Sequence, residues 1–577
     1  PLSHCSPGGR MPISFEEACE QVMAEGTMFN LVDAEIRGRT YKVFEAAPPN
    51  LLGIYELTAA RGDEAFLVYE DEQWSFGDTI AQGKAIGAAL AADHGVQPGD
   101  RVAIAMRNYP EWITALIGIH YAGAIGVMLN AWWTGEELAY GITDSGAKVV
   151  FADTERADRI LPQSDLGVAV IVARHTELPD GAIDIATLSS FEGDPPAVEI
   201  APDDDATIMY TSGTTGFPKG AVATHRAIIT AILGYAARGA VAAVMGRSAA
   251  AESGEKKDSK PPVFILTVPL FHITGLVPVM YGALAGGLKL VMMYKWEPKR
   301  ALELIEREKV STFVGVPTMV QDLIQCPEFD QFDTSSLSAV GGGGAPAAPD
   351  LVKKVDKTVS SASPGIGYGM TETTAYGPQN AGPDYLERPT STGRAVPVLQ
   401  IKVIDASGND LGPNEQGEIC FYGPNVIRAY WNKPEATEEA FIDGWLRSGD
   451  IGRIDEEGFV YVEDRAKDVV IRAGENIGCI EVEAVISSHP SVYEVAVFGL
   501  PHQRLGEELA CAVYLRDGTS LTADELQDHV SEHLAAFKVP SVVVIREEML
   551  PRSAQGKILK RHIRDELTEQ RAAQRSS

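Results

Sequence analysis

Along residues 11–390, hydrophobic and polar residues are arranged in two patterns that take turns along the chain. Short runs of apolar and β-branched residues predict strands, and the longer stretches between them, with apolar residues at helical spacing, predict helices. The predicted strands are residues 101–106, 123–129, 148–152, 168–172, 206–209, 263–268, 288–292, 312–316, 337–341 and 363–368. The clearest predicted helices are residues 15–23, 50–60, 76–93, 110–122 and 225–237. Strands that alternate with helices indicate mostly parallel sheets with covered faces.

The pattern changes twice toward the C-terminus. From residue 391 onward, short strands such as 400–404 and 417–421 are separated by turns, which predicts a small β-subdomain. Beyond residue 467 come strands and two or three helices, enough for a small α+β domain.

The predicted fold class is therefore α/β. A large N-terminal domain of parallel sheets covered by helices, plus the small β-subdomain, is followed by a small α+β C-terminal domain. The predicted boundaries are an N-terminal domain at 11–463 and a C-terminal domain at 468–577, joined by residues 464–467. Residues 1–10 are interpreted as an artificial leader before a native start at Met11.

Composition narrows the class of protein. The formal net charge of -31 disfavours a nucleic-acid partner, which calls for a basic field. The six cysteines show no C-x-x-C spacing, which argues against a disulfide scaffold or zinc site and fits a reducing cytoplasm. The apolar stretch 112–133 is interrupted by glycines and His120, so it predicts a buried helix and strand rather than a membrane span. Polar residues 246–262 predict a surface excursion.

A loop rich in glycine, serine and threonine follows the predicted strand 206–209. Residues 207–220 read Thr-Ile-Met-Tyr-Thr-Ser-Gly-Thr-Thr-Gly-Phe-Pro-Lys-Gly. Glycines allow backbone N–H groups to approach an anion, the hydroxyls add donors, and Lys219 adds a charge suited to phosphate. The spacing differs from a Walker A loop. The stretch predicts a polyphosphate site, with a flexible surface loop as the alternative.

Two glycine-containing stretches follow later predicted strands, at the strand ends where open α/β sheets bind ligands. In residues 368–372 (Tyr-Gly-Met-Thr-Glu), the aromatic ring suits stacking on a base and Glu372 suits Mg²⁺. In residues 341–346 (Gly-Gly-Gly-Gly-Ala-Pro), backbone without side chains allows a flat ring or an acyl chain to lie close. Each stretch taken alone is also compatible with an ordinary turn.

Two stretches nearer the C-terminus add an acid and a lysine. Residues 445–450 (Trp-Leu-Arg-Ser-Gly-Asp) predict a turn that ends in an exposed acid, Asp450, suited to a ribose diol. Residues 551–557 (Pro-Arg-Ser-Ala-Gln-Gly-Lys) place Lys557 on a glycine-containing turn in a basic tail. From there the lysine could reach another domain's site and stabilise developing charge. An ordinary turn aspartate and a solvated lysine are the alternatives for each stretch alone.

The order and spacing of these five stretches resemble the class I adenylate-forming (ANL) superfamily. That superfamily comprises acyl- and aryl-CoA synthetases, firefly luciferase and the adenylation domains of peptide synthetases. The resemblance extends from about residue 50 to 565 and rests on Thr-Ser-Gly-Thr-Thr-Gly-x-Pro-Lys-Gly, Tyr-Gly-x-Thr-Glu and the terminal Gly-Lys. It favours the acyl-CoA synthetase or fatty-acid–CoA ligase branch.

The resemblance implies a role for each residue that matches a motif. The residues implied to bind the ATP phosphates as a mobile loop are Thr211, Ser212, Gly213, Thr214, Thr215 and Lys219. The residues implied to bind the remainder of the nucleotide are Gly343, Gly344, Ala345 and Tyr368 around the adenine, Thr371 at phosphate, and Asp450 with Arg465 at the ribose; Gly369 is implied to be a further cofactor-binding residue. The remaining implied roles are metal binding at Glu372, catalysis at Lys557, Glu372 and His272, the hinge at Lys467, and the pantetheine tunnel at Gly474. The resemblance also implies that residues 464–467 as a whole are a hinge and that the small domain is mobile.

Three positions depart from the superfamily pattern. Asp464 stands where glycine usually precedes the arginine, Ser448 where threonine usually precedes Gly-Asp, and Cys479 where proline is common. None of these changes removes a charge that the chemistry needs. Cys479 is interpreted as a neutral packing residue rather than a nucleophile.

The implied reaction has two halves that share one site. A carboxylate first attacks the α-phosphorus of ATP, with Mg²⁺ as cofactor, to give an acyl-adenylate and pyrophosphate. The small domain then turns, Lys557 leaves, and the thiol of coenzyme A attacks the acyl carbonyl. Positioning and charge neutralisation do most of the catalysis.

The residues around His272 bear on the carboxylic acid. Amino-acid-activating relatives usually carry an aspartate just after the residue matching Phe271, and its absence here disfavours an α-amino acid. The predicted pocket segments are apolar and glycine-rich: 272–275, 316–319, 341–344 and 369–370. They favour a medium- to long-chain fatty acid first and an aryl or polycyclic acid second.

Other classes of protein are open on the same scaffold. One is a luciferase-type oxygenase, and another is a non-catalytic regulatory homologue, which intact Lys219, Glu372, Asp450 and Lys557 disfavour. The expected partners are small molecules only: the acid, ATP and CoA, with no nucleic acid and no transmembrane segment. A peripheral membrane contact and a homodimer are compatible with the sequence.

Overall fold

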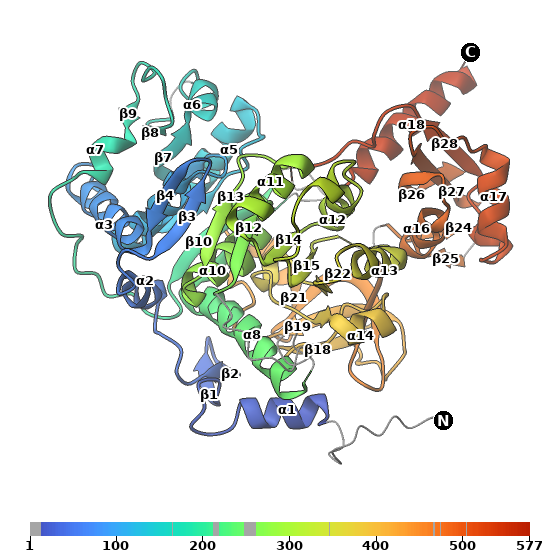
Figure 1. Cartoon of the computed structure of the whole chain (residues 1–577), viewed down its shortest axis with the longest axis horizontal. Coiled ribbons are helices and arrows are strands. Elements are labelled where there is room, and N and C mark those ends of the chain that lie inside the picture. The colour runs from blue at the N-terminus through green and yellow to red at the C-terminus, as the bar shows by residue number, and fades with distance from the viewer. Residues whose placement is uncertain are drawn as a thin grey trace.

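A computed structural model describes the chain in nine stretches: residues 13–163, 166–211, 218–246, 261–345, 347–465, 468–472, 475–502, 505–554 and 556–576. Figure 1 shows a large N-terminal body, coloured blue to orange, with a smaller red domain at one side. Most of the surface excursion expected at 246–262 lies outside the described residues.

Two eight-stranded sheets form the large domain, and the first carries the order β20-β11-β10-β6-β5-β7-β8-β9. Its strands are β5 (Arg101–Ala105), β6 (Ile125–Met128), β7 (Ala147–Asp153), β8 (Ala169–Ala173), β9 (Ile183–Asp184), β10 (Asp205–Thr211), β11 (Lys219–Thr224) and β20 (Ala429–Tyr430). The strands from β10 to β9 are parallel, whereas β11 and β20 are antiparallel at one edge. Strands buried on both faces explain the continuous apolar runs in the sequence.

The second sheet carries the order β17-β16-β15-β14-β12-β13-β3-β4. Its strands are β3 (Ala65–Tyr69), β4 (Glu72–Ser75), β12 (Val263–Leu266), β13 (Lys289–Met292), β14 (Thr312–Gly315), β15 (Ala339–Gly343), β16 (Ser363–Gly367) and β17 (Gln379–Ala381). Six central strands are parallel, and only the edge strands β4 and β17 are antiparallel. The predicted mostly parallel sheets are thus confirmed.

Helices cover and separate these sheets. They are α2 (Leu51–Ala59), α3 (Phe76–Ala92), α4 (Pro110–Tyr121), α5 (Gly135–Ser145), α6 (Thr154–Ile160), α7 (Ile185–Ser189), α8 (His225–Val244), α10 (Gly282–Gly286), α11 (Pro298–Glu308), α12 (Pro317–Ile324), α13 (Pro349–Thr358) and α14 (Gly382–Glu387), with a π-helix at Gly275–Tyr281 and 3-10 turns at Phe329–Gln331 and Thr371–Thr373. Ile104 of the first sheet and Ile265 of the second belong to one hydrophobic core. Nearly all of α4 is buried, which confirms the interpretation of 112–133 as buried structure.

Helix α8 is longer than predicted, because it continues past Gly239 to Val244. By length and composition alone it could cross a membrane. Within its most apolar window 50% of the residues are buried inside the protein, as in the core helix of a globular domain.

A β-subdomain and an N-terminal hairpin complete the large domain. Their elements are α1 (Phe15–Val22), β1 (Leu31–Ile36), β2 (Arg39–Phe44), β18 (Gln400–Ile404), β19 (Gly417–Tyr422), α15 (Pro434–Ala440), β21 (Phe441–Ile442), β22 (Trp445–Ile454) and β23 (Val460–Arg465). The last five strands pair into one sheet, which fits the predicted β-subdomain.

The prediction that Asp450 lies exposed on a turn is wrong. Asp450 lies inside the long strand β22, and only 8% of the residue is exposed. The register explains the error: Arg447 pairs with Cys420 but Ile451 pairs with Glu418, so the strand bulges between them. The Ser-Gly signal therefore marks a β-bulge, with Gly449 at a φ of 72°, and not the end of the strand.

The small domain is a five-stranded sheet with helices on both faces. Its elements are β24 (Val470–Arg472), β25 (Glu475–Ile477), α16 (Cys479–Ser488), β26 (Val492–His502), β27 (Gly506–Leu515), α17 (Ala523–Ser531), a 3-10 turn (Ala536–Lys538), β28 (Val542–Arg546) and α18 (Lys560–Ser576). Alternate residues of β26 face two different cores: Val497 packs with Val482 of α16, and Phe498 packs with Ile563 of α18. This is the predicted α+β domain.

Candidate active site

The two ends of the glycine-rich loop lie side by side at the end of β10. Thr211 and Lys219 are antiparallel partners, and the Thr211 hydroxyl donates to the Lys219 carbonyl (3.3 Å). The loop therefore joins two strands, unlike a P-loop, which leads into a helix, so any anion there depends on the loop's own donors. Four predicted phosphate-binding residues lie outside the described residues: Ser212, Gly213, Thr214 and Thr215.

Tyr430 connects Lys219 to the predicted metal ligand Glu372. The ammonium of Lys219 lies 5.3 Å from the centroid of the Tyr430 ring. The Tyr430 hydroxyl donates to Oε1 of Glu372 (2.7 Å). Burial and the carboxylate raise the pKa of Tyr430 well above its usual range, which keeps the hydroxyl a donor. Sequence reasoning missed Tyr430, which lies in no recognised motif.

The predicted adenine and ribose residues are in direct contact. The Tyr368 hydroxyl donates to Oδ2 of Asp450 (2.6 Å), although Tyr368 directly follows β16 and Asp450 lies in β22 of another sheet. Arg465 pairs with Asp450 across the β22–β23 ladder, so the predicted neighbour is adjacent in the backbone register. The Asp450 N–H donates to the Ser448 hydroxyl (3.0 Å), which fixes the bulge that presents the carboxylate.

The glycine run is a strand end and a sharp bend. Gly343 is the last residue of β15, and a methyl group placed on it would lie 2.3 Å from the Gly367 carbonyl oxygen. Gly344 has a φ of 82°, a conformation that favours glycine, and Ala345 follows it. Glycine is thus required here by the close approach of neighbouring backbone as well as by any ligand.

The turn that holds the predicted metal ligand Glu372 is closed tightly. A methyl group on Gly369 would lie 2.3 Å from the Ala375 carbonyl oxygen, so this position admits only glycine. Thr371 begins the 3-10 turn Thr371–Thr373 that carries Glu372, which is 7% exposed. A buried carboxylate near Lys219, at the end of the predicted phosphate loop, has the oxygen-donor chemistry that Mg²⁺ requires when it shares ligands with phosphate.

Lys557 reaches this site from the small domain. A methyl group placed on Gly344 would lie 3.6 Å from Cε and 3.8 Å from Nζ of Lys557. The lysine follows Gly556, whose φ of 80° makes the tight turn and whose carbonyl accepts from the Thr318 hydroxyl (3.1 Å). The domain orientation, which the sequence leaves open, is therefore the one that brings Lys557 to the large domain.

His272 is held neutral near that lysine. Burial and the charge of Lys557 lower the pKa of His272 to about 3. Its Nδ1 accepts from the Thr274 N–H (3.3 Å), so the neutral ring carries its proton on Nε2. At neutral pH His272 thus offers a donor and no second positive charge.

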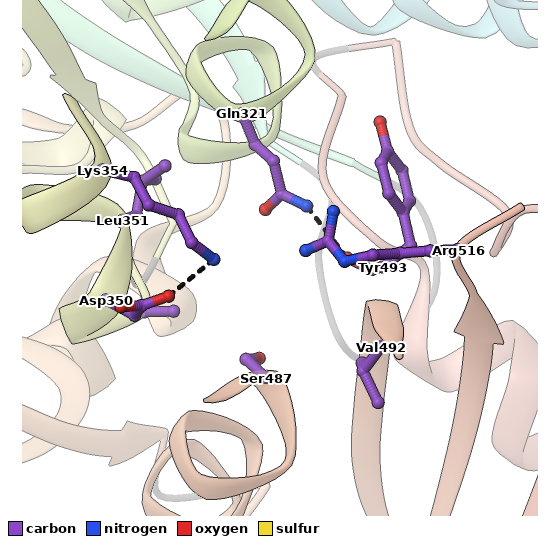
Figure 2. A pocket seen from close by; sticks show the side chains of 9 residues that line it. Gln321, Asp350, Leu351, Lys354, Ser487, Val492, Tyr493 and Arg516 are labelled. Atoms are coloured by element: carbon purple, nitrogen blue, oxygen red, sulfur yellow. Dashed lines mark hydrogen bonds and ion pairs between the residues drawn. The ribbon is translucent and has the colours of Figure 1, made fainter. Parts of the chain in front are cut away.

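Polar bonds between α12 and the small domain hold this orientation. They join Thr318 Oγ1 to the Gly556 carbonyl (3.1 Å), Gln321 Nε2 to the Tyr493 carbonyl (2.9 Å), the Tyr493 hydroxyl to Asp322 (2.9 Å) and Arg516 to Gln325 Oε1 (2.8 Å). Figure 2 shows the seam, with Gln321 facing Tyr493 and Arg516, and with Lys354 paired to Asp350. The hydrogen bonds between α12 and the small domain are thus made by polar side chains and backbone carbonyls. The predicted hinge Lys467 and tunnel residue Gly474 lie outside the described residues.

Comparison with known proteins agrees with this arrangement. The chain is 34% identical over 477 residues to the long-chain-fatty-acid–CoA ligase FadD13 of Mycobacterium tuberculosis, a match covering 82% of this chain and 89% of that protein. It is also 34% identical over 471 residues to feruloyl-CoA synthase of Amycolatopsis sp, covering 82% and 89%. The structure of o-succinylbenzoate CoA synthetase (MenE) from Bacillus subtilis, in complex with its acyl-adenylate intermediate, aligns with a TM-score of 0.73 and 29% identity over 90% of this chain and 98% of that one.

Both domains match a described family. Residues 56–431 match the AMP-binding enzyme family and residues 481–557 match its C-terminal domain. The chain belongs to the AMP-binding enzyme family, within the adenylate-forming (ANL) superfamily. It is an acyl-CoA synthetase, an acid–thiol ligase that uses ATP and CoA.

Proposed function

We propose that this ligase activates a medium- to long-chain fatty acid as its acyl-adenylate and transfers the acyl group to coenzyme A, releasing AMP and pyrophosphate. One observation carries the first half-reaction. Lys557 of the small domain lies against Gly344 and near His272 of the large domain. The same large domain holds the hydrogen-bonded pair Tyr368 and Asp450 (2.6 Å). A cation at this point suits the junction between a substrate carboxylate and the α-phosphate.

In the proposed adenylation, a carboxylate oxygen bonds to the α-phosphorus and the bond from that phosphorus to the bridging oxygen of pyrophosphate breaks. Lys557 neutralises charge on both reacting groups, while Tyr368 and Asp450 orient the nucleoside. Lys219 and the loop after Thr211 bind the phosphates that leave. Glu372 would hold Mg²⁺, which supplies charge neutralisation to the phosphates when bound.

In the second half-reaction the sulfur of CoA bonds to the acyl carbon, and the bond from that carbon to the AMP oxygen breaks. We propose that the small domain turns about Lys467 between the halves and that Gly474 then lines the pantetheine path. The polar seam on α12 supports this proposal, because its hydrogen bonds are only partly buried and can exchange for bonds to water at a modest net cost.

Apolar residues of two predicted pocket segments meet beside β15, around a cavity with room for about one water molecule. Its lining includes Pro317, Val320, Gly341, Gly342, Val352 and Val355. Two predicted pocket segments, 316–319 and 341–344, contribute to it. FadD13 is a long-chain-fatty-acid–CoA ligase by name, which favours a fatty acid here, and the similarity to feruloyl-CoA synthase keeps an aryl acid as the second candidate.

The cellular setting is proposed from the thiols. The five cysteines in the described residues (Cys19, Cys326, Cys420, Cys479 and Cys511) are all free and buried, which supports a reducing cytoplasm. A homodimer and a peripheral membrane contact stay predictions from the sequence.

Pyrophosphate release with a panel of carboxylic acids tests the proposal. Fatty acids of graded chain length, ferulate, a polycyclic acid and an α-amino acid are each supplied with ATP and Mg²⁺, with and without CoA. We expect the highest kcat/KM with a fatty acid and formation of its CoA thioester. A maximum with an aryl acid would overturn the fatty-acid assignment, and no release with any acid would favour a regulatory homologue. Light emission with a luciferin would indicate an oxygenase.

A further inference from the structure

A hydrogen bond crosses from the large domain to the small domain at the predicted hinge. Oδ2 of Asp464, in β23, accepts a short bond from the backbone N–H of Cys479, the first residue of α16. Asp464 is 2% exposed and Cys479 is fully buried, so water does not compete for this bond. The first N–H groups of a helix lack partners within the helix, and its dipole favours a negative charge there. A carboxylate is therefore well suited to this position.

The Asp464 carboxylate also lies near Lys560, the first residue of the helix that follows Lys557. Lys560 begins α18, three residues after Lys557, and pairs with Glu483 of α16 (2.6 Å). Burial opposes the charge of Lys560, but the Glu483 carboxylate, with smaller contributions from Cys479 and Asp464, outweighs burial and raises the lysine's pKa. Asp464 thus lies near the segment that carries Lys557.

The two ends of the Asp464–Cys479 bond belong to separate folding units. Asp464 pairs with Ile451 in the β-subdomain sheet, whereas α16 packs through Val482 into the core of the small domain. Residues 466 and 467, between these units, lie outside the described stretches. A rotation about this connection moves α16 relative to β23, so the bond is specific to the orientation in which Lys557 contacts the large domain.

We propose that Asp464 is a positioning residue for the first half-reaction. Its bond to the Cys479 N–H holds the small domain in the orientation that delivers Lys557, and so favours adenylation over thioester formation. This inference rests on the proposed function, in which Lys557 serves only the first half. A glycine at position 464 would offer no acceptor for this bond, and a proline at position 479 would offer no donor.

Substitution of Cys479 isolates the backbone donor. Cys479→Pro removes the N–H, while the first helical position accepts proline, and Gly478 already has the φ of -73° and ψ of 119° that a residue before proline adopts. The proline ring would also occupy space toward the Asp464 carboxylate. Cys479→Ala is the matched control: it keeps the N–H and removes only the thiol, which bonds to the Asp468 carbonyl (3.1 Å).

Both half-reactions are measured in each variant: pyrophosphate release from acid and ATP, and thioester formation from pre-made acyl-adenylate and CoA. The ratio of the first rate to the second should fall about tenfold in Cys479→Pro and stay at the wild-type value in Cys479→Ala, since a charge-assisted bond is lost only in the former.

Substitution of Asp464 tests the acceptor. Asp464→Gly should lower the ratio, and Asp464→Asn, which keeps an acceptor oxygen, should recover part of it. Glu463→Gln is the control, because that carboxylate bonds to Arg453 (3.0 Å) and Gln416 (2.6 Å) within the β-subdomain. The double variant Asp464→Gly with Cys479→Pro should lower the rate ratio by less than the product of the two single fold-changes. Both substitutions remove the same hydrogen bond, and glycine at 464 also relieves the crowding by the proline ring.

The outcomes separate this inference from the proposed function. If the wild-type protein runs both half-reactions and the ratio is unchanged in Cys479→Pro and Asp464→Gly, the positioning role is overturned. An equal loss of both half-reactions in these variants overturns it too. If the wild-type protein runs neither half-reaction with any acid in the panel, the proposed function itself fails.

Discussion

The two halves of the site are built in different ways. In the large domain, Tyr368 bonds to Asp450 (2.6 Å) and Tyr430 bonds to Glu372 (2.7 Å), and both carboxylates are almost fully buried. The small domain contributes Lys557 on a turn that the Thr318 bond to Gly556 holds against α12. The large-domain groups are fixed by packing, whereas the lysine depends on polar contacts between domains.

This difference assigns the two halves to different tasks. Buried, bonded carboxylates hold their geometry before the substrate arrives, which suits groups that are needed in both half-reactions. Polar seam bonds contribute about 0.5–1.5 kcal/mol each, so a few of them can hold an orientation and still release it. We call the buried large-domain groups the fixed half of the site and the turn that carries Lys557 the movable half. Substitutions in the fixed half should lower the rates of both half-reactions, and substitutions in the movable half should lower only one.

Removing the lysine should have the largest effect. We expect Lys557→Ala to lower the rate of adenylation by about 10²–10³, because a preorganised charge at the reacting groups is lost. Pyrophosphate release under saturating ATP measures it. Lys353→Ala, an exposed lysine on α13, is the control and should behave as wild type. An adenylation rate that stays normal in Lys557→Ala would remove the lysine from the mechanism.

Removing Asp450, the acid predicted to hold the ribose, should have the next largest effect and should lower the rates of both half-reactions. Asp450→Ala deletes the acceptor of the Tyr368 hydroxyl and a buried charge, so we expect kcat/KM for ATP to fall about 10–100-fold. Thioester formation from the acyl-adenylate should fall as well, because that intermediate keeps the ribose. Steady-state kinetics with ATP and with the acyl-adenylate measure the two losses. A loss limited to one half-reaction would contradict the claim that the buried groups of the large domain serve both.

Tyr430→Phe should have a smaller effect. It deletes the hydroxyl that donates to Glu372 and keeps the ring beside Lys219. Loss of one bond to a charged group should lower the adenylation rate about 3–10-fold and change the Mg²⁺ concentration needed for half the maximal rate. A titration with Mg²⁺ measures both quantities. An unchanged titration curve would mean that Tyr430 does not orient the carboxylate.

We expect the smallest effect from His120, a buried histidine of the large domain that makes the stability of this domain depend on pH. Burial lowers the pKa of His120 to about 4, and its two nitrogens are committed to the Tyr55 hydroxyl (2.7 Å) and the Ala206 carbonyl (3.1 Å). In the unfolded chain His120 takes up a proton near pH 6.5, whereas in the folded chain it does so only near pH 4. The contribution of neutral His120 to the free energy of unfolding is therefore complete above pH 6.5 and decreases as the pH falls from 6.5 to 4. Urea unfolding at pH 5 and pH 7.5 measures it. His120→Gln should show a weaker dependence on pH, and an identical dependence would rule out this origin.

The sequence predicts the strand and helix order well because each element has a strong local pattern, as in α4, whose buried residues are almost all apolar. The motifs single out Tyr368, Glu372 and Lys557, and the structure places Tyr368 against Asp450, Glu372 against Tyr430 and Lys557 against Gly344. Tyr430 escapes prediction, since its bond to Glu372 is made across 58 residues of chain. The strand position of Asp450 was missed because a bulge and a turn use the same Ser-Gly signal. The Asp464–Cys479 contact depends on how two domains meet, which no local pattern encodes.

The central claim is that the small domain supplies Lys557 for adenylation alone. The most direct measurement is the rate at which Lys557→Ala converts a pre-made acyl-adenylate and CoA into the thioester. We expect a rate close to that of the wild-type protein, although the same variant has lost adenylation. A thioester rate that falls as far as the adenylation rate would contradict the division of labour between the fixed and movable halves.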